Sequence, residues 1–181
     1  MRPMWQFWDS AISEETIDKM ISTCQKYKKQ TAGVSDKGTI NKEHRRSEVR
    51  WITDPEIRRT LWAFALEANR NAFGFNITEY CEVQYTEYYG TNEGHYDWHI
   101  DTMWDKDMAF DRKLSLTIQL SSPEEYVGGE FEFSEVEQLP KENKNKGSVV
   151  VFPSYLYHRV KPVTEGTRKS LVAWFEGPRW R

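Results

Sequence analysis

The chain lacks the features that would place it in a membrane or in a disulfide-rich class. It has only two cysteines, Cys24 and Cys81, which lie far apart and form no metal-binding spacing. No apolar run approaches the roughly 18 residues needed to cross a bilayer. The segment from Met1 to Asp9 has no long apolar stretch followed by a cleavage site, so it does not resemble a signal peptide. We therefore expect a cytoplasmic protein with reduced thiols and no membrane partner.

Several signatures of catalysis and nucleic-acid binding are also missing. The sequence has no Gly-x-Ser-x-Gly nucleophile motif and no Gly-rich phosphate loop. Its formal net charge of -3 gives no overall cationic field, and we expect no nucleic-acid partner. Internal repeats, low-complexity tracts and interior linkers are absent. With 181 residues, of which 14% are aromatic, the chain has the size of one domain, and we expect a single domain over residues 1–181.

The N-terminal part has mainly helical patterns. Ser13 is placed to cap a helix that runs over about residues 14–30. Asp54 and Pro55 begin a second helix, with a capping carboxylate and a proline at the first helical position. The polar segment 31–48 between them predicts a loop.

From about residue 80 the pattern changes to short segments that are typical of strands. We predict strands near residues 80–89, 96–101, 113–121, 129–134, 148–153, 157–163 and 168–176. Helices followed by many strands indicate an α+β fold that is mainly β. We expect an antiparallel barrel or sandwich over about 80–176, backed by helical support over about 1–79.

The strand predicted near 113–121 has two different faces. One face is wholly aliphatic, and the other carries Ser115, Thr117 and Gln119. A strand with one solvent-exposed face would be expected to carry more charge there. Small neutral polar groups instead predict a strand that packs on helices outside and faces a polar pocket inside.

Residues that can bind a metal gather on the second predicted strand. His95 and Asp97 form one His-x-Asp pair, and His99 and Asp101 form another. Residues two apart on a strand point to the same side, so either pair could aim an imidazole and a carboxylate at one ion. His158, at the start of a later strand, could add a third ligand. Two imidazoles and one carboxylate leave three positions open on Fe(II), which suits a metal that binds a cosubstrate and O₂.

An arginine strengthens this interpretation, because a His-x-Asp pair alone is more often a simple hydrogen-bonded pair. Arg168 follows His158 by ten residues, on a strand predicted to run beside it, and Ser170 is its neighbour on the same face. Burying a guanidinium in a barrel is costly without an anion. The carboxylate of a dicarboxylic acid would satisfy it through two parallel hydrogen bonds.

The chain resembles the prolyl-hydroxylase-type branch of the 2-oxoglutarate/Fe(II) oxygenases over roughly residues 80–176. The matching motifs are Tyr-x-x-His-x-Asp at 96–101, Tyr-Val-Gly-Gly-Glu-Phe at 126–131, Phe-Pro-Ser at 152–154, His-Arg-Val-Lys-Pro-Val at 158–163 and Gly-Thr-Arg at 166–168. Residues 1–79 resemble this branch only in being helical, with Arg46 and Ser47 before a short strand at 49–52. The resemblance implies a double-stranded β-helix, a jelly-roll or cupin-like barrel.

The resemblance also distinguishes the two His-x-Asp pairs, because Tyr96 lies three residues before His99. It implies that His99, Asp101 and His158 bind Fe(II). It further implies that Arg168 holds the distal carboxylate of 2-oxoglutarate. Many eukaryotic prolyl hydroxylases have lysine at this last position, and other members have arginine.

Further contacts to the cosubstrate are implied as well. A tyrosine upstream usually supports the same carboxylate in this family. Tyr88 fits best, although Tyr85 or Tyr89 could take its place because the segment around them is longer than the family's loop. Gln119 matches a strand position that often faces the cosubstrate. Ser170, which lies on the same strand face as Arg168, is the remaining expected contact to the cosubstrate.

The resemblance implies a dioxygenase that uses Fe(II), 2-oxoglutarate and O₂, with ascorbate as an optional further cofactor. It would hydroxylate an unactivated C–H bond and release succinate and CO₂. A prolyl residue in a peptide or protein is the expected substrate, and a free amino acid or other small molecule is the alternative. Trp51, Trp98, Trp104 and Tyr155 could line an aromatic entrance, and the segment 103–111 could form a lid.

Two other classes of function use the same residues differently. A zinc hydrolase could have the same three ligands, but it would need a general base and has no evident use for Arg168. A barrel that binds a small acid or peptide without turnover would be expected to lose a metal ligand. Bound metal and O₂ uptake that depends on 2-oxoglutarate distinguish these classes from an oxygenase.

Overall fold

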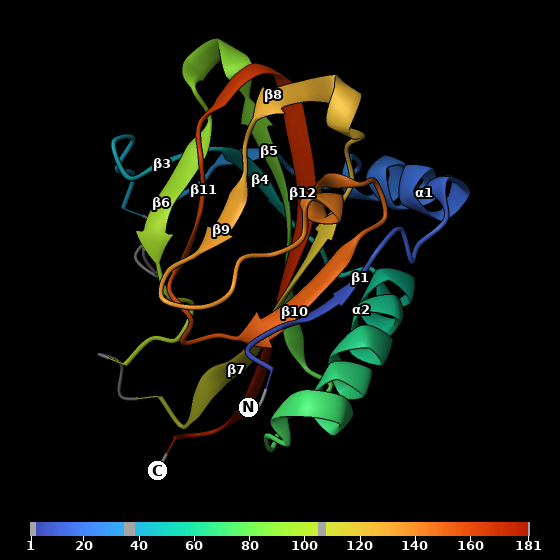
Figure 1. The fold of residues 1–181 in the computed structure, drawn as a ribbon, viewed down its shortest axis with the longest axis vertical. Coiled ribbons are helices and arrows are strands. Elements are labelled where there is room, and N and C mark those ends of the chain that lie inside the picture. Colours follow the sequence, from blue (N-terminus) through green and yellow to red (C-terminus); the bar gives the residue numbers. More distant parts are fainter. Residues whose placement is uncertain (1–2, 35–38, 105–107, 181) are drawn as a thin grey trace.

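Two antiparallel sheets face each other, and the helices cover the outside of the larger one (Figure 1). The structure is a computed structural model that describes residues 3–34, 39–104 and 108–180. The larger sheet has the strand order β1-β10-β7-β12-β5-β4-β2, with β8 paired to β12, and the smaller sheet has the order β3-β6-β11-β9. This arrangement is mainly β with N-terminal helices, as the strand pattern predicts, and it is the double-stranded β-helix that the family resemblance implies.

The bounds of the elements follow. The larger sheet contains β1 (Gln6–Trp8), β2 (Gln30–Thr31), β4 (Glu48–Trp51), β5 (Cys81–Tyr89), β7 (Phe110–Gln119), β8 (Tyr126–Gly128), β10 (Val149–Pro153) and β12 (Val163–Pro178). The smaller sheet contains β3 (Arg45–Arg46), β6 (His95–His99), β9 (Phe131–Phe133) and β11 (His158–Val160). The helices are α1 (Glu14–Cys24) and α2 (Pro55–Ala68), and α2 continues into a π-helical turn, Asn69–Phe73.

Both helices begin at the residues that the sequence predicts. The Ser13 hydroxyl accepts a hydrogen bond from the backbone of α1, and the Asp54 carboxylate accepts two from the first turn of α2. The end of α1 differs from the prediction, because the helix stops at Cys24 rather than near Gln30. The last residue of its buried stripe is Cys24, and Gln30 instead pairs with β4. No helix among the described residues is long and apolar enough to cross a membrane.

The main hydrophobic core lies between the helices and the larger sheet. It buries Ile17 of α1 and Leu61 of α2 against aliphatic side chains such as Val83, Leu116 and Leu171. Each such side chain contributes about 1.5–3 kcal/mol when fully buried. Because strand residues alternate, the polar face of β7 points the other way, toward the smaller sheet. The two-faced pattern of this strand is therefore what the sequence analysis predicted.

The N-terminal region also contributes strands that the sequence analysis did not identify. Only a short strand at 49–52 was predicted there, and it corresponds to β4. In addition, β1 pairs with β10, β2 pairs with β4, and β3 pairs with β6 of the smaller sheet. Strands of two or three residues are too short to show a periodic pattern, and non-local pairing defines them.

Candidate metal centre

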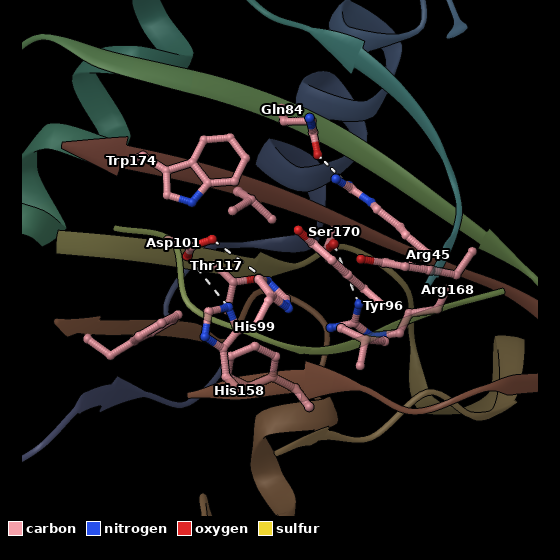
Figure 2. A pocket seen from close by; sticks show the side chains of 15 residues that line it. Arg45, Gln84, Tyr96, His99, Asp101, Thr117, His158, Arg168, Ser170 and Trp174 are labelled. Atoms are coloured by element: carbon pink, nitrogen blue, oxygen red, sulfur yellow. Dashed lines mark hydrogen bonds and ion pairs between the residues drawn. The ribbon is translucent and has the colours of Figure 1, made fainter. Parts of the chain in front are cut away.

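A cavity lies between the two sheets (Figure 2). Its wall includes His99, Asp101 and His158 from the side of β6 and β11. Arg168 and Ser170 of β12 also face into it. The polar pocket that the alternation of β7 predicts is therefore present, and it contains the predicted metal ligands together with Arg168 and Ser170.

The three predicted metal ligands converge in this cavity. Among the described residues they form the one group of His, Cys, Asp and Glu side chains whose donor atoms lie within 4.8 Å of one another. His99 Nε2 is 3.7 Å from Asp101 Oδ1, and His158 Nε2 is 3.5 Å from Asp101 Oδ2. The two histidines are direct partners in the β6–β11 register, which brings residues far apart in the chain together.

Hydrogen bonds fix both imidazoles in the orientation that a metal needs. His99 Nδ1 lies 2.7 Å from the Asp97 carbonyl, and His158 Nδ1 lies 2.8 Å from the Leu156 carbonyl. A carbonyl oxygen can only accept, so each Nδ1 carries a hydrogen, and in the neutral form of each ring Nε2 is then the nitrogen with a lone pair for a metal. Burial, together with neighbouring His158, lowers the pKa of His99 to about 3, so His99 is neutral at physiological pH.

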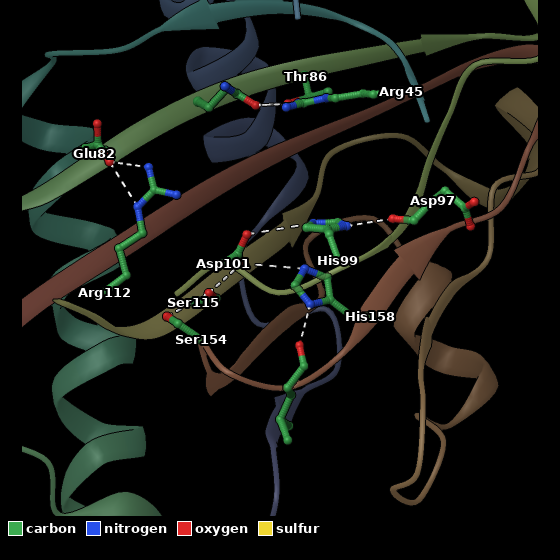
Figure 3. Close-up of polar contacts among 12 residues, drawn as sticks. Arg45, Glu82, Thr86, Asp97, His99, Asp101, Arg112, Ser115, Ser154 and His158 are labelled. Atoms are coloured by element: carbon green, nitrogen blue, oxygen red, sulfur yellow. Dashed lines mark hydrogen bonds and ion pairs between the residues drawn. The ribbon is translucent and has the colours of Figure 1, made fainter. Parts of the chain in front are cut away.

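The carboxylate between the histidines is held in its charged form (Figure 3). Burial opposes ionisation of Asp101, but the nearby His158, His99 and Arg112 and the hydroxyl of Ser115 outweigh it and lower its pKa. Ser115 Oγ donates to Asp101 Oδ2 at 2.6 Å. Two imidazoles and one carboxylate are a donor set that suits Fe(II), so the residues present fit this ion.

A β-bulge explains why one His-x-Asp pair faces the cavity and the other does not. In the register of β6 and β11, His99 pairs with His158 and Tyr96 pairs with Val160, so β6 has one extra residue between these positions. As a result, Tyr96 and His99 share a side although they are three residues apart, and their rings stack with centroids 3.5 Å apart.

The other pair lies outside the cavity. Both ring nitrogens of His95 contact backbone carbonyls, those of Glu93 and Glu43. Asp97 is exposed and accepts a hydrogen bond from the backbone of Trp98. This pair therefore has a local hydrogen-bonding role, and the structure separates it from the metal centre.

Arg168 is buried deeper in the same cavity. It is 4% exposed, and no described carboxylate forms an ion pair with it. Its guanidinium has a long contact of 3.5 Å to Ser170 Oγ and lies 5.6 Å from the centre of the Tyr88 ring. Tyr88 is also its direct partner in the β5–β12 register. A buried guanidinium with so little compensation is suited to bind a carboxylate.

A glycine is required beside this arginine. Gly129 has a φ of +63°, and a Cβ atom there would lie 2.9 Å from Arg168 Cδ and equally close to Val163. Gly128 has a φ of +80°, and its Cβ would approach the Pro162 carbonyl oxygen to 2.3 Å. The Gly-Gly motif thus provides both the turn and the space in which the arginine lies.

The structure separates the three candidate tyrosines. Tyr88 lines the cavity, whereas Tyr85 points to the opposite face of β5 into the main core. Tyr89 accepts a hydrogen bond from Lys29 near the surface. Gln119 does not line the main cavity; it donates to the Tyr126 hydroxyl and borders a smaller cavity that Arg168 also borders.

The aromatic residues suggested for a substrate entrance lie away from the cavity wall. The bulge turns Trp98 outward, where it stacks on Tyr157. Trp104 is 55% exposed, and Tyr155 packs on Trp180. Trp51 is exposed and lies beside Trp174, which does line the cavity. A substrate role for these residues stays a prediction. The segment suggested as a lid includes residues 105–107, which lie outside the described residues.

The cavity wall also contains Trp174, which alternation places on the same face of its strand as Arg168, and two residues that the sequence did not indicate, Arg45 and Gln84. Gln84 could have been found by alternation, because it shares a face with Tyr88. Arg45 could not, since it comes from β3, a two-residue strand in a segment predicted as a loop. Only the pairing of β3 with β6 places it there.

The comparisons with known sequences agree with this geometry. A family model described as the 2OG-Fe(II) oxygenase superfamily matches residues 83–176. A PKHD-type hydroxylase of Hyphomonas neptunium is 41% identical over 83 residues, which cover 45% of this chain and 37% of that protein. A PKHD-type hydroxylase of Crocosphaera subtropica is 41% identical over 81 residues, covering 44% of this chain and 36% of that protein. The match thus spans little more than a third of these relatives.

Solved structures share the fold over nearly the whole chain. A prolyl-4-hydroxylase of Pseudomonas putida aligns with a TM-score of 0.73 at 19% identity, covering 98% of this chain and 94% of that one. A prolyl hydroxylase of Trichoplax adhaerens, in complex with a hypoxia inducible factor peptide fragment, aligns with a TM-score of 0.74 at 14% identity, covering 95% and 83%. A viral collagen prolyl hydroxylase from Paramecium Bursaria Chlorella virus-1, as a 2OG complex, aligns with a TM-score of 0.68 at 22% identity, covering 97% of each chain.

Proposed function

Because the chain belongs to the 2OG-Fe(II) oxygenase superfamily, we propose that it is a 2-oxoglutarate-dependent dioxygenase that hydroxylates a prolyl residue in a peptide or protein. One observation carries the proposal. His99, Asp101 and His158 converge in a cavity that also holds a buried guanidinium, that of Arg168, without a protein counter-ion among the described residues. A metal centre and a carboxylate site in one cavity are what a reaction with 2-oxoglutarate requires.

In this proposal the three ligands hold Fe(II) through the two Nε2 atoms and the Asp101 carboxylate. When bound, Fe(II) and 2-oxoglutarate supply the oxidative chemistry: O₂ is reduced, the cosubstrate is decarboxylated to succinate and CO₂, and one oxygen atom enters a C–H bond of the substrate. The chain itself fixes the ligands. The backbone carbonyls of Asp97 and Leu156 orient the imidazoles, and Ser115 orients the carboxylate.

The deeper end of the cavity binds the cosubstrate in this account. Arg168 provides the charge that pairs with the distal carboxylate of 2-oxoglutarate. Tyr88 and Ser170 lie beside it and limit how that carboxylate can be placed. Because Arg168 is almost fully buried, water does not screen the pair, so this contact selects strongly for a dicarboxylate of the correct length.

The preference for a prolyl substrate is supported by the relatives. The similar sequences are described as hydroxylases, and each of the solved structures named above is described as a prolyl hydroxylase. In this chain, the aromatic ring of Trp174 and the ring of Tyr96 line the cavity near the metal centre and provide flat apolar surfaces. Such surfaces suit a five-membered aliphatic ring.

The geometry disfavours a zinc hydrolase. Among the described residues that line the cavity, Asp101 is the only carboxylate, and both histidines share its metal site. A hydrolase would need a further general base within hydrogen-bond reach of the reacting water. It would also leave the buried Arg168 without a partner, which is energetically costly.

The test is a comparison of O₂ consumption in the purified protein loaded with Fe(II), with and without 2-oxoglutarate. The proposal predicts that O₂ uptake requires 2-oxoglutarate and is matched by succinate formation, which is measured with and without ascorbate. Prolyl peptides should stimulate both, and mass spectrometry should show that these peptides gain one oxygen atom. Zinc bound in preference to iron, with no succinate formed, would contradict the proposal. Succinate formation without modification of any prolyl compound would leave the reaction class in place and remove the substrate.

A further inference from the structure

A second guanidinium faces the same cavity, and no role in metal or cosubstrate binding accounts for it. Arg45 of β3 is 7% exposed and lines the cavity wall. Its guanidinium carbon lies 4.4 Å from the centre of the Tyr96 ring, and that ring stacks on His99. Arg45 is therefore separated from the metal centre by a single aromatic ring (Figure 2).

The partners of Arg45 are all neutral. Nε donates to Ser47 Oγ at 3.0 Å, Nη2 donates to Gln84 Oε1 at 2.7 Å, and Nη1 donates to the Gly33 carbonyl at 3.3 Å. A guanidinium has five N–H donors, so two remain, one on each terminal nitrogen. Among the described residues neither of these finds an acceptor, and no carboxylate forms an ion pair with Arg45.

An independent observation also indicates a missing acceptor. Trp174 is 6% exposed and lines the cavity, yet its indole N–H has no hydrogen-bond acceptor among the described residues. Figure 2 shows the indole nitrogen on the side of the ring that is turned toward Asp101. A buried donor without an acceptor costs about 1–3 kcal/mol, so a ligand rich in acceptor atoms would be favoured here.

The balance of charge in the cavity indicates the sign of that ligand. When the site is loaded, Fe(II), Arg45 and Arg168 carry positive charge, and Asp101 and the two carboxylates of 2-oxoglutarate carry negative charge. One positive charge is then left over among the described lining residues. Arg168 is matched by the distal carboxylate, so the unmatched charge is that of Arg45. Leaving it unpaired in a buried site is costly.

We propose that Arg45 binds a carboxylate of the primary substrate, so that the preferred prolyl substrate carries a negative charge close to the hydroxylated ring. This inference rests on the proposed function and narrows its substrate class. The carboxylate has two possible sources: the proline's own carboxylate, as in a C-terminal prolyl residue or a free amino acid, or an acidic side chain next to an internal prolyl residue.

The experiment compares ligands that differ only in this charge. Binding is measured by calorimetry, without O₂ so that no turnover occurs, to the protein loaded with Fe(II) and 2-oxoglutarate. The first pair is N-acetylproline and its amide, and the second is a peptide with an internal proline flanked by Asp or by Asn. The acid of at least one pair is expected to bind more tightly, by on the order of 10- to 100-fold, as for a charge-assisted hydrogen bond. The pair that shows the difference identifies the source.

Three variants test whether Arg45 causes the difference. Arg45→Gln should weaken binding of the acid to the level of the amide. Gln84→Glu keeps the shape of the side chain and supplies an internal counter-ion at the position that lies 2.7 Å from Arg45 Nη2. This variant should stay folded and lose the preference for the acid over the amide. Arg46→Gln is the matched control, because Arg46 pairs with Glu93 near the surface and should leave the preference unchanged.

Equal binding of acid and amide in both pairs, or a preference that survives Gln84→Glu, would overturn the proposal. Lack of binding by every compound would overturn the carboxylate anchor and the prolyl substrate together. Acid-selective binding that is lost in Gln84→Glu, combined with no succinate formation under O₂, would instead support the anchor and contradict the proposed reaction.

Discussion

The hydroxyl of Ser115 donates a hydrogen bond of 2.6 Å to Oδ2 of Asp101, from β7 to the segment that follows β6. Ser154 in turn donates to Ser115 Oγ at 3.0 Å, because the hydrogen of Ser115 is already used. Both serines are fully buried, so this chain of hydrogen bonds excludes water from one side of the carboxylate. Ser115 and Ser154 together set the orientation in which the Asp101 carboxylate would bind a metal ion.

Ser115→Ala should therefore weaken Fe(II) binding. Loss of a hydrogen bond that orients a metal ligand typically lowers metal affinity by roughly 10- to 100-fold. A competition titration with a chelator measures the effect. Ser13→Ala is the control, because it removes the N-cap of α1 and should lower stability by about 1 kcal/mol without changing the metal affinity. Equal metal affinity in Ser115→Ala and the wild type would show that Asp101 does not bind the ion in this orientation.

Tyr88 and Tyr85 have opposite environments on the same strand and provide a matched pair. Tyr88→Phe should raise the Kd for 2-oxoglutarate by roughly 10-fold, because a hydroxyl group beside the carboxylate site is lost. Tyr85→Phe should leave this Kd unchanged. The Tyr85 hydroxyl is buried and has no hydrogen-bond partner among the described residues, so its removal should also leave stability equal or higher. A rise in Kd for Tyr85→Phe alone would mean that the tyrosine was assigned wrongly.

Glu176 should make stability depend on pH. Burial, with neighbouring Glu82, raises its pKa to about 7 from 4.5, against the opposite effect of Arg112. The folded protein therefore holds the proton more tightly than the unfolded chain, and stability falls as the pH rises from 4.5 through about 7. Glu176→Gln removes the free-energy cost of ionising a buried carboxyl group. The variant should therefore be more stable than the wild type by on the order of 1–2 kcal/mol at about pH 8, with no difference below about pH 4.

Urea unfolding at the two pH values measures this difference, with the exposed Glu124→Gln as the control. A variant that is less stable than the wild type at the higher pH would show that the Glu176 carboxylate is stabilised rather than strained by its surroundings.

The two cysteines should be unreactive in the folded protein. Cys24 and Cys81 are both free and buried in the main core. Burial raises the pKa of Cys24 to about 12 and that of Cys81 to about 11, so almost no thiolate is present at neutral pH. Alkylation followed by mass spectrometry should label neither thiol in the native protein and both in urea. Rapid labelling of the native protein would contradict the burial of these side chains.

Local patterns in the sequence were sufficient to predict much of the fold and the centre of the site. The caps at Ser13 and Asp54 need only neighbouring residues, and the two faces of β7 follow from alternation. The ligands His99, Asp101 and His158 were identified by motif spacing together with a family resemblance. These features depend on few residues, so a single sequence contains them.

Features that arise from pairing between distant segments could not be predicted. The bulge in β6, which places Tyr96 and His99 on one side, exists only in the register with β11. Arg45 reaches the cavity because β3 pairs with β6, although its own segment has no strand pattern. The outward position of Trp98 follows from the same bulge. Each of these depends on contacts across the chain that no local period shows.

The two His-x-Asp pairs allow the most direct test of the metal centre. Asp101→Ala and Asp97→Ala remove the same group at positions four residues apart, one inside the cavity and the other exposed. Bound iron and succinate formation in the presence of 2-oxoglutarate are measured for both variants and the wild type. We predict that Asp101→Ala loses both and that Asp97→Ala retains both. Retained iron and turnover in Asp101→Ala, or their loss only in Asp97→Ala, would contradict the assignment of His99, Asp101 and His158 as the metal ligands.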